Sequence, residues 1–155
     1  MKIIGMIPAR LGSKRIKHKN LRLLGGKPLI CHTIEKCKNV KAFDKVFINS
    51  DGDIFNSIAK DCGISFYKRD RKLATDDATQ DQFIYDFVKN VDCDLIVQVN
   101  PTSPFVTSNE IENFISEMID NNFDTMLSFK KEQVEGIFKE RPINFDPMVQ
   151  MPKSQ

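Results

Sequence analysis

Residues Lys2–Asn20 read KIIGMIPARLGSKRIKHKN, and this stretch decides the fold. Ile3–Ile7 is a short apolar run without alternation, which is typical of a strand covered on both faces of a parallel sheet. After Ile7 the chain turns polar and strongly basic, with Gly12 and Ser13 forming a turn-prone pair. The stretch therefore predicts a buried first strand followed by a cationic loop.

Outward from this stretch, short apolar runs alternate with segments of helical periodicity. The further predicted strands are 45–49, 64–67, 95–99 and 125–129. Four helices are predicted. The first starts at Pro28, and the second is capped by Asp51 or Asp53 and ends at Gly63. The third follows a cap from Asp76 or Thr79, and the fourth starts at a capping box formed by Thr107 and Glu110. This alternation predicts an α/β fold with βαβ units, a mostly parallel sheet and a single domain over residues 1–155.

The composition narrows the class of protein. The 155 residues are 41% hydrophobic and 28% charged, as in a soluble globular protein. No apolar run reaches the roughly 18 residues of a membrane-spanning helix, so we expect no membrane role and a cytoplasmic location. Only two histidines and four scattered cysteines occur, without a C-x-x-C pair, which argues against a zinc site.

Charge is distributed unevenly along the chain. The first 34 residues hold eight Lys or Arg and no acid, whereas the other 121 hold 15 basic and 21 acidic residues. Such an asymmetry points to an anionic partner of the N-terminal segment.

Ligands of open α/β sheets bind beyond the carboxyl ends of the strands. The segments that follow four of the predicted strands are all polar, and we expect them to converge there: 8–20, 50–53, 68–80 and 100–105. The Gly12–Ser13 turn can present backbone N–H groups to phosphate oxygens, with Lys and Arg adding charge. Neither the Walker A pattern nor G-x-G-x-x-G occurs.

Two alternatives compete with a phosphate site in this loop. The loop could be a solvated basic segment, or it could bind nucleic acid. Proteins that bind single-stranded nucleic acid usually have aromatic residues among the basic ones, on which the bases stack, and no aromatic residue occurs before Phe43. The acidic remainder of the chain would also repel a polyanion. A compact anion such as a nucleotide triphosphate fits better.

The stretch Ile7–Ile30, IPARLGSKRIKHKNLRLLGGKPLI, resembles the N-terminal signature of the sugar-acid cytidylyltransferases. The resemblance continues through Ser50–Gly52, Lys72–Thr79 and Asn100–Pro104, and covers essentially the whole chain. It implies a three-layer, Rossmann-like nucleotidyltransferase fold. It also implies transfer of CMP from CTP to a 2-keto-3-deoxy sugar acid, N-acetylneuraminate or a related nonulosonate, with release of pyrophosphate. A catalytically incomplete nucleotide- or RNA-binding module that uses the same loop is the alternative function.

The resemblance also implies roles for individual residues. The catalytic candidates are Arg10, Lys14, Lys19 and Lys153, and the nucleotide-binding candidates are Arg10, Ser13, Lys14, Asn20, Arg69, Ala78 and Gln80. Asn100 matches a substrate-contacting position that is usually Gln in the sialic-acid members, and Lys153 falls near a catalytic arginine of the family. Lysine keeps the charge there but loses the bidentate geometry of arginine.

Members of the family run well past residue 155, and a late aspartate-containing segment supplies ligands for Mg²⁺ and part of a homodimer contact. We expect this chain to lack that C-terminal segment. Mg²⁺ is the implied cofactor, and Asp51, Asp76 and Asp77 are the candidate carboxylates at the ends of the predicted strands. None of the three is assigned as a metal ligand.

Overall fold

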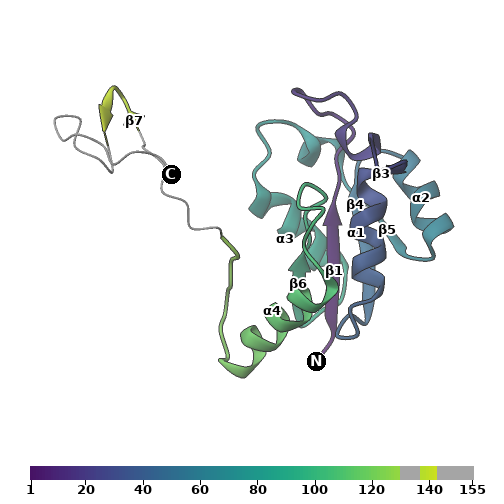
Figure 1. The fold of residues 1–155 in the computed structure, drawn as a ribbon, viewed down its shortest axis with the longest axis vertical. Helices are drawn as coiled ribbons and strands as arrows, with labels where there is room; N and C mark the ends of the chain where they lie inside the picture. The colour runs from purple at the N-terminus through teal and green to yellow at the C-terminus, as the bar shows by residue number, and fades with distance from the viewer. Residues whose placement is uncertain (130–136, 143–155) are drawn as a thin grey trace. The chain divides into compact units, whose positions relative to one another are not determined.

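The computed structural model describes residues 1–129 and 137–142. Residues Met1–Phe123 form one compact unit around four parallel strands in the spatial order β5-β4-β1-β6 (Figure 1). These strands are β1 (Ile3–Pro8), β4 (Lys45–Ser50), β5 (Ser65–Lys68) and β6 (Leu95–Gln98). Four of the five predicted strands are thus confirmed to within one residue at either end.

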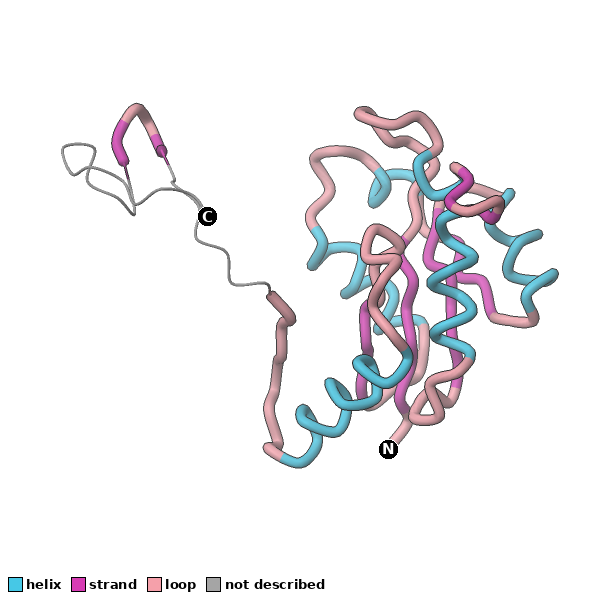
Figure 2. The backbone as a smooth tube through the Cα atoms, in the orientation of Figure 1, coloured by secondary structure: helices cyan, strands magenta, loops and turns pink. Residues whose placement is uncertain are grey.

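Helices cover both faces of this sheet. They are α1 (Leu29–Lys38), α2 (Ile54–Cys62), α3 (Gln80–Asn90) and α4 (Ser108–Asp120), drawn in cyan in Figure 2. Ile3 and Ile7 of β1 belong to the core that α1, α2 and α4 cover, whereas Ile4 and Met6 pack with Phe87 of α3. Because both faces are covered, β1 is apolar without alternation. The α/β class with three layers and a mostly parallel sheet is therefore confirmed.

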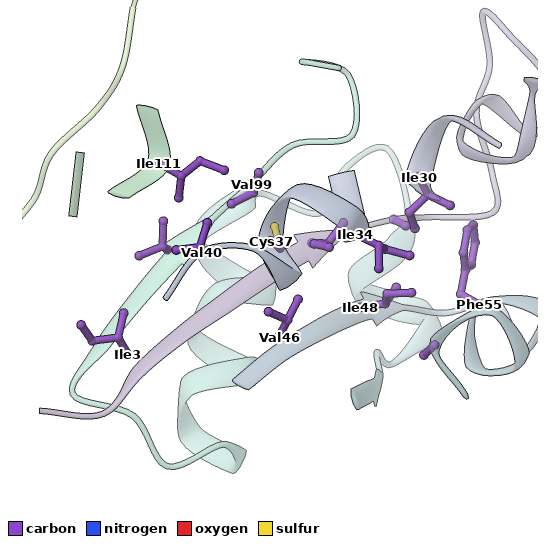
Figure 3. Packing of buried hydrophobic residues seen from close by; sticks show 14 of the residues in the cluster. Ile3, Ile30, Ile34, Cys37, Val40, Val46, Ile48, Phe55, Val99 and Ile111 are labelled. Carbon is purple, nitrogen blue, oxygen red and sulfur yellow. The ribbon is translucent and has the colours of Figure 1, made fainter. Parts of the chain in front are cut away.

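The larger core lies between α1 and the sheet. Figure 3 shows Ile34 and Cys37 of α1 over the strands, near Val46 and Ile48 of β4. Ile34 and Ile48 are fully buried. The parallel pairing of β1 with β4 and β6 sets the end of the sheet at which the basic loop leaves.

The predicted helix ends are mostly confirmed. Gly63 ends α2 in the left-handed region, at φ 67° and ψ 36°, which glycine adopts without strain. Thr107 and Glu110 form the predicted capping box: the Glu110 amide donates to Thr107 Oγ1 at 3.2 Å, and the Thr107 amide donates to Glu110 Oε2 at 2.7 Å.

The predicted cap of α2 is a correction. Asp53 occupies the N-cap position, but its side chain accepts no capping bond and pairs instead with Lys68 of β5. The carboxylate of Asp51 also does not cap α2, since it accepts the Leu11 amide at 3.0 Å. Both aspartates therefore serve contacts between strand-end loops.

A short hairpin that the sequence reasoning did not predict follows the basic loop. Its strands are β2 (Leu23–Leu24) and β3 (Lys27–Pro28), and the loop residues Gly25 and Gly26 have φ of 58° and 83°. A Gly-Gly pair between two short arms is a known signal for a two-residue hairpin turn. The hairpin leads directly into α1.

Asp124–Gln155 forms a second unit, described here by itself. The prediction of a strand at 125–129 is wrong: these residues adopt no regular structure, and the side chains of Leu127 and Phe129 are 77% and 87% exposed. An apolar run becomes a strand only where another strand pairs with it, and local sequence does not supply that partner. Further on, β7 (Ile137–Phe138) and β8 (Arg141–Pro142) form an antiparallel hairpin.

No helix in the described part of the chain has the length and apolarity needed to cross a membrane.

Candidate active site

A pocket of about 600 Å³ opens at the carboxyl ends of the parallel strands, the end marked by the arrowhead of β1 (Figure 1). The loops after β1, β5 and β6 line it, together with α3. Its lining residues are Pro8, Arg10, Ser13, Lys14, Arg15, Ile16, Lys19, Asn20, Arg69, Asp76, Phe83, Asn100, Pro101 and Thr102.

Three of the four polar segments that were expected to converge therefore do so. The exception is 50–53, the segment after β4, which does not line the pocket. This segment is hydrogen-bonded to two of the loops that line the pocket: Asp51 accepts the Leu11 amide, and the Ser50 carbonyl accepts the Arg69 amide at 2.9 Å.

The structure brings together most of the residues singled out by the sequence. Seven of them line this one pocket: Arg10, Ser13, Lys14, Lys19, Asn20, Arg69 and Asn100. Ala78 and Gln80 lie at the entrance to α3 and are not among the lining residues. Lys153 lies outside the described residues.

The basic loop is shaped by short-range backbone hydrogen bonds. His18, at φ 53°, introduces a 3₁₀ turn, η1 (Lys19–Leu21), and the Lys19 amide donates to the Ile16 carbonyl at 3.2 Å. Asn20 is buried in this turn at 6% exposure, whereas Lys19 is half-buried and lines the pocket. The turn thus holds Lys19 and Asn20 in place, whereas the Lys14 side chain is largely exposed.

Arg69 is a buried cation of the pocket, with only 4% of its surface exposed. Its Nε donates to Asn49 Oδ1 at 2.8 Å and its Nη2 donates to the Asn49 carbonyl at 2.9 Å. The guanidinium carbon lies 4.1 Å from the centre of the Phe83 ring, a cation–π geometry. Burial lowers the pKa of Arg69 to about 10, so the side chain is still charged at neutral pH.

Two cations of the basic loop, Arg10 and Lys14, are held by one carboxylate. Asp76 Oδ1 lies 2.9 Å from Arg10 Nη2, and Asp76 Oδ2 lies 2.7 Å from Lys14 Nζ. Arg10 Nη1 also donates to the Thr75 carbonyl at 3.1 Å. Hydrogen bonds from Lys14 and then Arg10 lower the pKa of Asp76.

The prediction that Asp76 caps the following helix is therefore wrong, and Thr79 is the cap. The Gln82 amide donates to Thr79 Oγ1 at 3.4 Å and the Thr79 amide donates to Gln82 Oε1 at 2.9 Å. With Thr79 satisfying the helix end, the Asp76 carboxylate is left to pair with cations across the pocket.

Asn100 is oriented by a residue of β6 that the sequence reasoning missed. Gln98 Nε2 donates to Asn100 Oδ1 at 3.0 Å, while Gln98 Oε1 is buried and without a hydrogen-bond partner among the described residues. This bond leaves the two N–H groups of the Asn100 amide for other acceptors. The turn after Asn100 is attached to α1, where Lys36 Nζ donates to the Pro104 carbonyl and the Ser108 hydroxyl donates to the Lys36 carbonyl.

Phe83 was missed as well. It was predicted only as part of an amphipathic helix, and its place in the sequence does not distinguish it from the other apolar residues of that helix. Only the packing of α3 on the sheet brings its ring against Arg69.

The described residues do not form a metal centre by themselves, since no three His, Cys, Asp or Glu side chains in that part of the chain are grouped to hold an ion. Of the three carboxylates considered from the sequence, Asp51 and Asp77 are not among the pocket-lining residues, and Asp76 is already paired with two cations.

The chain matches a family of known enzymes over most of its length. The family model for cytidylyltransferases matches residues 4–148. The chain belongs to the cytidylyltransferase family, which confirms the resemblance drawn from Ile7–Ile30.

The relatives are named for more than one sugar acid. An N-acylneuraminate cytidylyltransferase of Streptococcus agalactiae serotype III is 35% identical over 142 residues, covering 89% of this chain and 34% of the relative. A 3-deoxy-manno-octulosonate cytidylyltransferase of Bdellovibrio bacteriovorus is 33% identical over 121 residues, covering 78% of this chain and 47% of the relative. The chain thus spans about a third to a half of the length of these relatives.

A solved structure shares the fold. It is that of a CMP:2-keto-3-deoxy-manno-octonic acid synthetase complexed with CTP, which matches with a TM-score of 0.71 and 22% identity, over 79% of this chain and 49% of that one. The three-layer nucleotidyltransferase architecture expected from the sequence is confirmed by this match.

Proposed function

We propose that this protein transfers CMP from CTP to a 2-keto-3-deoxy sugar acid and releases pyrophosphate. One observation carries the proposal: within the described part of the chain, five cationic side chains and a single acidic one line a pocket at the carboxyl ends of the parallel strands. The cations are Arg10, Lys14, Arg15, Lys19 and Arg69. A triphosphate is the compact polyanion that such a pocket suits, and membership of the cytidylyltransferase family supports CTP as its source.

The reaction is one in which positioning and charge neutralisation do most of the work. The anomeric hydroxyl of the sugar acid attacks the α-phosphorus of CTP and loses its proton to water, and the bond from the α-phosphorus to the bridging oxygen breaks so that pyrophosphate leaves with the electron pair. Arg10, Lys14 and Lys19 neutralise the triphosphate and the charge that develops on the leaving group. Arg69, held by Asn49 and Phe83, offers a rigid cation toward the nucleotide.

The sugar-acid side of the pocket is assigned to Asn100. Its Oδ1 is taken by Gln98, so its two N–H groups are the donors available to oxygens of the substrate. Asn is one methylene shorter than the Gln of sialic-acid members, which favours a related nonulosonate over N-acetylneuraminate itself. Relatives named for N-acylneuraminate and for 3-deoxy-manno-octulosonate make both kinds of acid reasonable test substrates.

Mg²⁺ belongs to the proposal as a partner of the nucleotide. Because the described residues offer no group of ligands for it, we propose that the ion arrives bound to CTP, whose phosphate oxygens are ligands that Mg²⁺ prefers. Lys153, the remaining catalytic candidate, would add a further positive charge.

The test is pyrophosphate release by the purified chain with CTP, Mg²⁺ and each of three acids: N-acetylneuraminate, N,N'-diacetyllegionaminate and 3-deoxy-manno-octulosonate. We expect release with CTP but not ATP, abolished in Arg10→Ala. Calorimetric titration with CTP, ATP and a short single-stranded RNA accompanies the assay. Absence of CTP binding at millimolar concentration would contradict the proposal. Preferential RNA binding with a steep salt dependence would support the nucleic-acid alternative instead.

A further inference from the structure

Asp76 is the one acidic side chain among the described residues that line this cationic pocket. It lies after η2 (Arg71–Ala74), in the segment that leads into α3. Its partners Arg10 and Lys14 lie far earlier in the chain, in the loop after β1. Asp76 therefore joins two of the three loops that build the pocket.

Both carboxylate oxygens of Asp76 are engaged, and by different cations. Oδ1 pairs with Arg10 at 2.9 Å and Oδ2 pairs with Lys14 at 2.7 Å. The same arginine is also bonded to the Thr75 carbonyl, next to Asp76, at 3.1 Å. Arg10 and Lys14 are two of the side chains that bind the triphosphate in the proposed function.

A carboxylate and a phosphate group compete for the same donors. Each presents anionic oxygens that accept charge-assisted hydrogen bonds from guanidinium and ammonium groups. An N–H bond of Arg10 or Lys14 that points at Asp76 is not available to a phosphate oxygen. Phosphate binding at these two side chains is consequently an exchange and not a simple addition.

Exposure makes this exchange easy. The Asp76 side chain is 41% exposed and that of Lys14 is 78% exposed, so water can reach the pair and the separated charges are readily solvated. Exposed ion pairs of this kind are weak and reversible. The contact to Asp76 is thus weak enough to be replaced by a polyphosphate.

We propose that Asp76 is a built-in competitor of the phosphate subsite. In the empty pocket its carboxylate occupies Arg10 and Lys14. The terminal phosphates of CTP displace it, and after transfer it returns to these cations and promotes release of pyrophosphate. This inference rests on the proposed function for the identity of the anion, but its physical content is the exchange at Arg10 and Lys14.

A competing carboxylate and a purely supporting salt bridge predict opposite changes in anion affinity when Asp76 is removed. If Asp76 only ordered the loop, its removal would weaken anion binding. If it competes, its removal frees Arg10 and Lys14 and tightens anion binding. CMP, which lacks the terminal phosphates, would change little in either case.

Inorganic pyrophosphate is the sharpest probe, because it needs neither a base site nor a sugar acid. We would titrate pyrophosphate, CTP and CMP calorimetrically into the wild type and into Asp76→Asn, in metal-free buffer at about 0.15 M ionic strength, where exposed charges are screened over about 8 Å. The matched control is Asp77→Asn, which makes the same charge change one residue away at a side chain that does not line the pocket. Arg10→Ala, alone and combined with Asp76→Asn, removes the shared donor.

Asp76→Asn should bind pyrophosphate and CTP about three- to tenfold more tightly than the wild type, the range expected for release of one or two exposed ion pairs. Asp77→Asn should leave both affinities nearly unchanged. Adding Asp76→Asn to an Arg10→Ala chain should give a smaller gain than adding it to the wild type. Equal affinities in the two single Asn variants, or weaker binding in Asp76→Asn, would overturn the inference. Asp76→Ala gives a second test with the same expected direction, and thermal unfolding verifies that each variant is folded.

The two proposals fail differently. Tighter pyrophosphate binding in Asp76→Asn without any preference for CTP over ATP would support the competitor role of Asp76 and contradict the cytidylyltransferase function. Turnover with CTP together with unchanged pyrophosphate affinity in Asp76→Asn would support the cytidylyltransferase function and contradict the competitor role.

Discussion

Arg69 and the basic loop Arg10–Asn20 present positive charge to the same pocket, but the protein holds them in opposite ways. Arg69 is 4% exposed and is fixed by two hydrogen bonds to Asn49 and by the Phe83 ring. Arg10 and Lys14 are partly or largely exposed and are held by the carboxylate of Asp76. A buried, satisfied cation has one geometry, whereas an exposed one can exchange partners.

The difference suggests a division of work within the pocket. A rigid cation suits a part of the substrate that must be placed in one orientation. Adaptable cations suit phosphates, which change from triphosphate to pyrophosphate and a phosphodiester during the reaction. Substitutions in the two regions should reveal whether Arg69 and the basic loop are as different as their surroundings indicate.

The largest effect is expected from Arg69→Ala. The variant leaves the side-chain oxygen of Asn49 buried without its donor and removes the stack on Phe83, while the Asn49 carbonyl keeps the Ala9 amide as a donor at 3.0 Å. We expect the free energy of unfolding to fall by about 2–4 kcal/mol, measured by urea denaturation. Lys14→Ala, in the basic loop, should leave the urea midpoint within error of the wild type. Equal midpoints for the two variants would remove the distinction between a structural and an adaptable cation.

Arg10→Ala should show the converse pattern, with a large loss of binding and little loss of stability. Removing a charged donor to phosphate is expected to weaken CTP binding about 10- to 150-fold, measured by calorimetry. Arg10→Lys should recover only part of this loss, because lysine keeps the charge without the planar fork. A variant that unfolds as readily as Arg69→Ala would show instead that Arg10 supports the fold.

A smaller difference between the two regions is expected in how strongly CTP affinity depends on ionic strength. Exposed charges are screened over about 8 Å at physiological salt, and buried ones much less. The affinity advantage of the wild type over Lys14→Ala for CTP should therefore shrink several-fold between about 50 and 500 mM NaCl. The advantage over Arg69→Lys should stay nearly constant across the same titration. Parallel salt slopes for both variants would contradict the assignment of Lys14 to an exposed phosphate contact.

The smallest effect is expected from Phe83→Leu. Leucine keeps an apolar side chain on α3 but removes the aromatic face under Arg69, at a cost of about 0.5–2 kcal/mol in the free energy of unfolding. Phe83→Tyr preserves the ring and is the control. Should Phe83→Leu and Phe83→Tyr unfold at the same urea concentration, the hydrogen bonds to Asn49 alone would account for the fixed position of Arg69.

Much of this architecture could be predicted because the signals are local. The buried run Ile3–Ile7 was identified from its lack of alternation, and Gly63 and the Thr107–Glu110 capping box were identified from their position relative to an apolar stripe. The hairpin at Gly25–Gly26 had an equally local signal and could have been found. The apolar run at 125–129 had the composition of a strand, but strand formation needs a pairing partner that composition does not specify.

The same distinction between local signals and tertiary contacts applies to the pocket. The amino-acid sequence by itself determined an α/β fold, a cationic loop after the first strand, and a signature that matches the cytidylyltransferase family. Only the tertiary structure decided that Asp76 pairs with Arg10 and Lys14 instead of capping α3, that Phe83 lies under Arg69, and that Gln98 orients Asn100. The physical reason is that periodicity and capping depend on neighbours within a few residues. The partners of a charged or polar side chain at a strand end depend on which loops the packed sheet brings together.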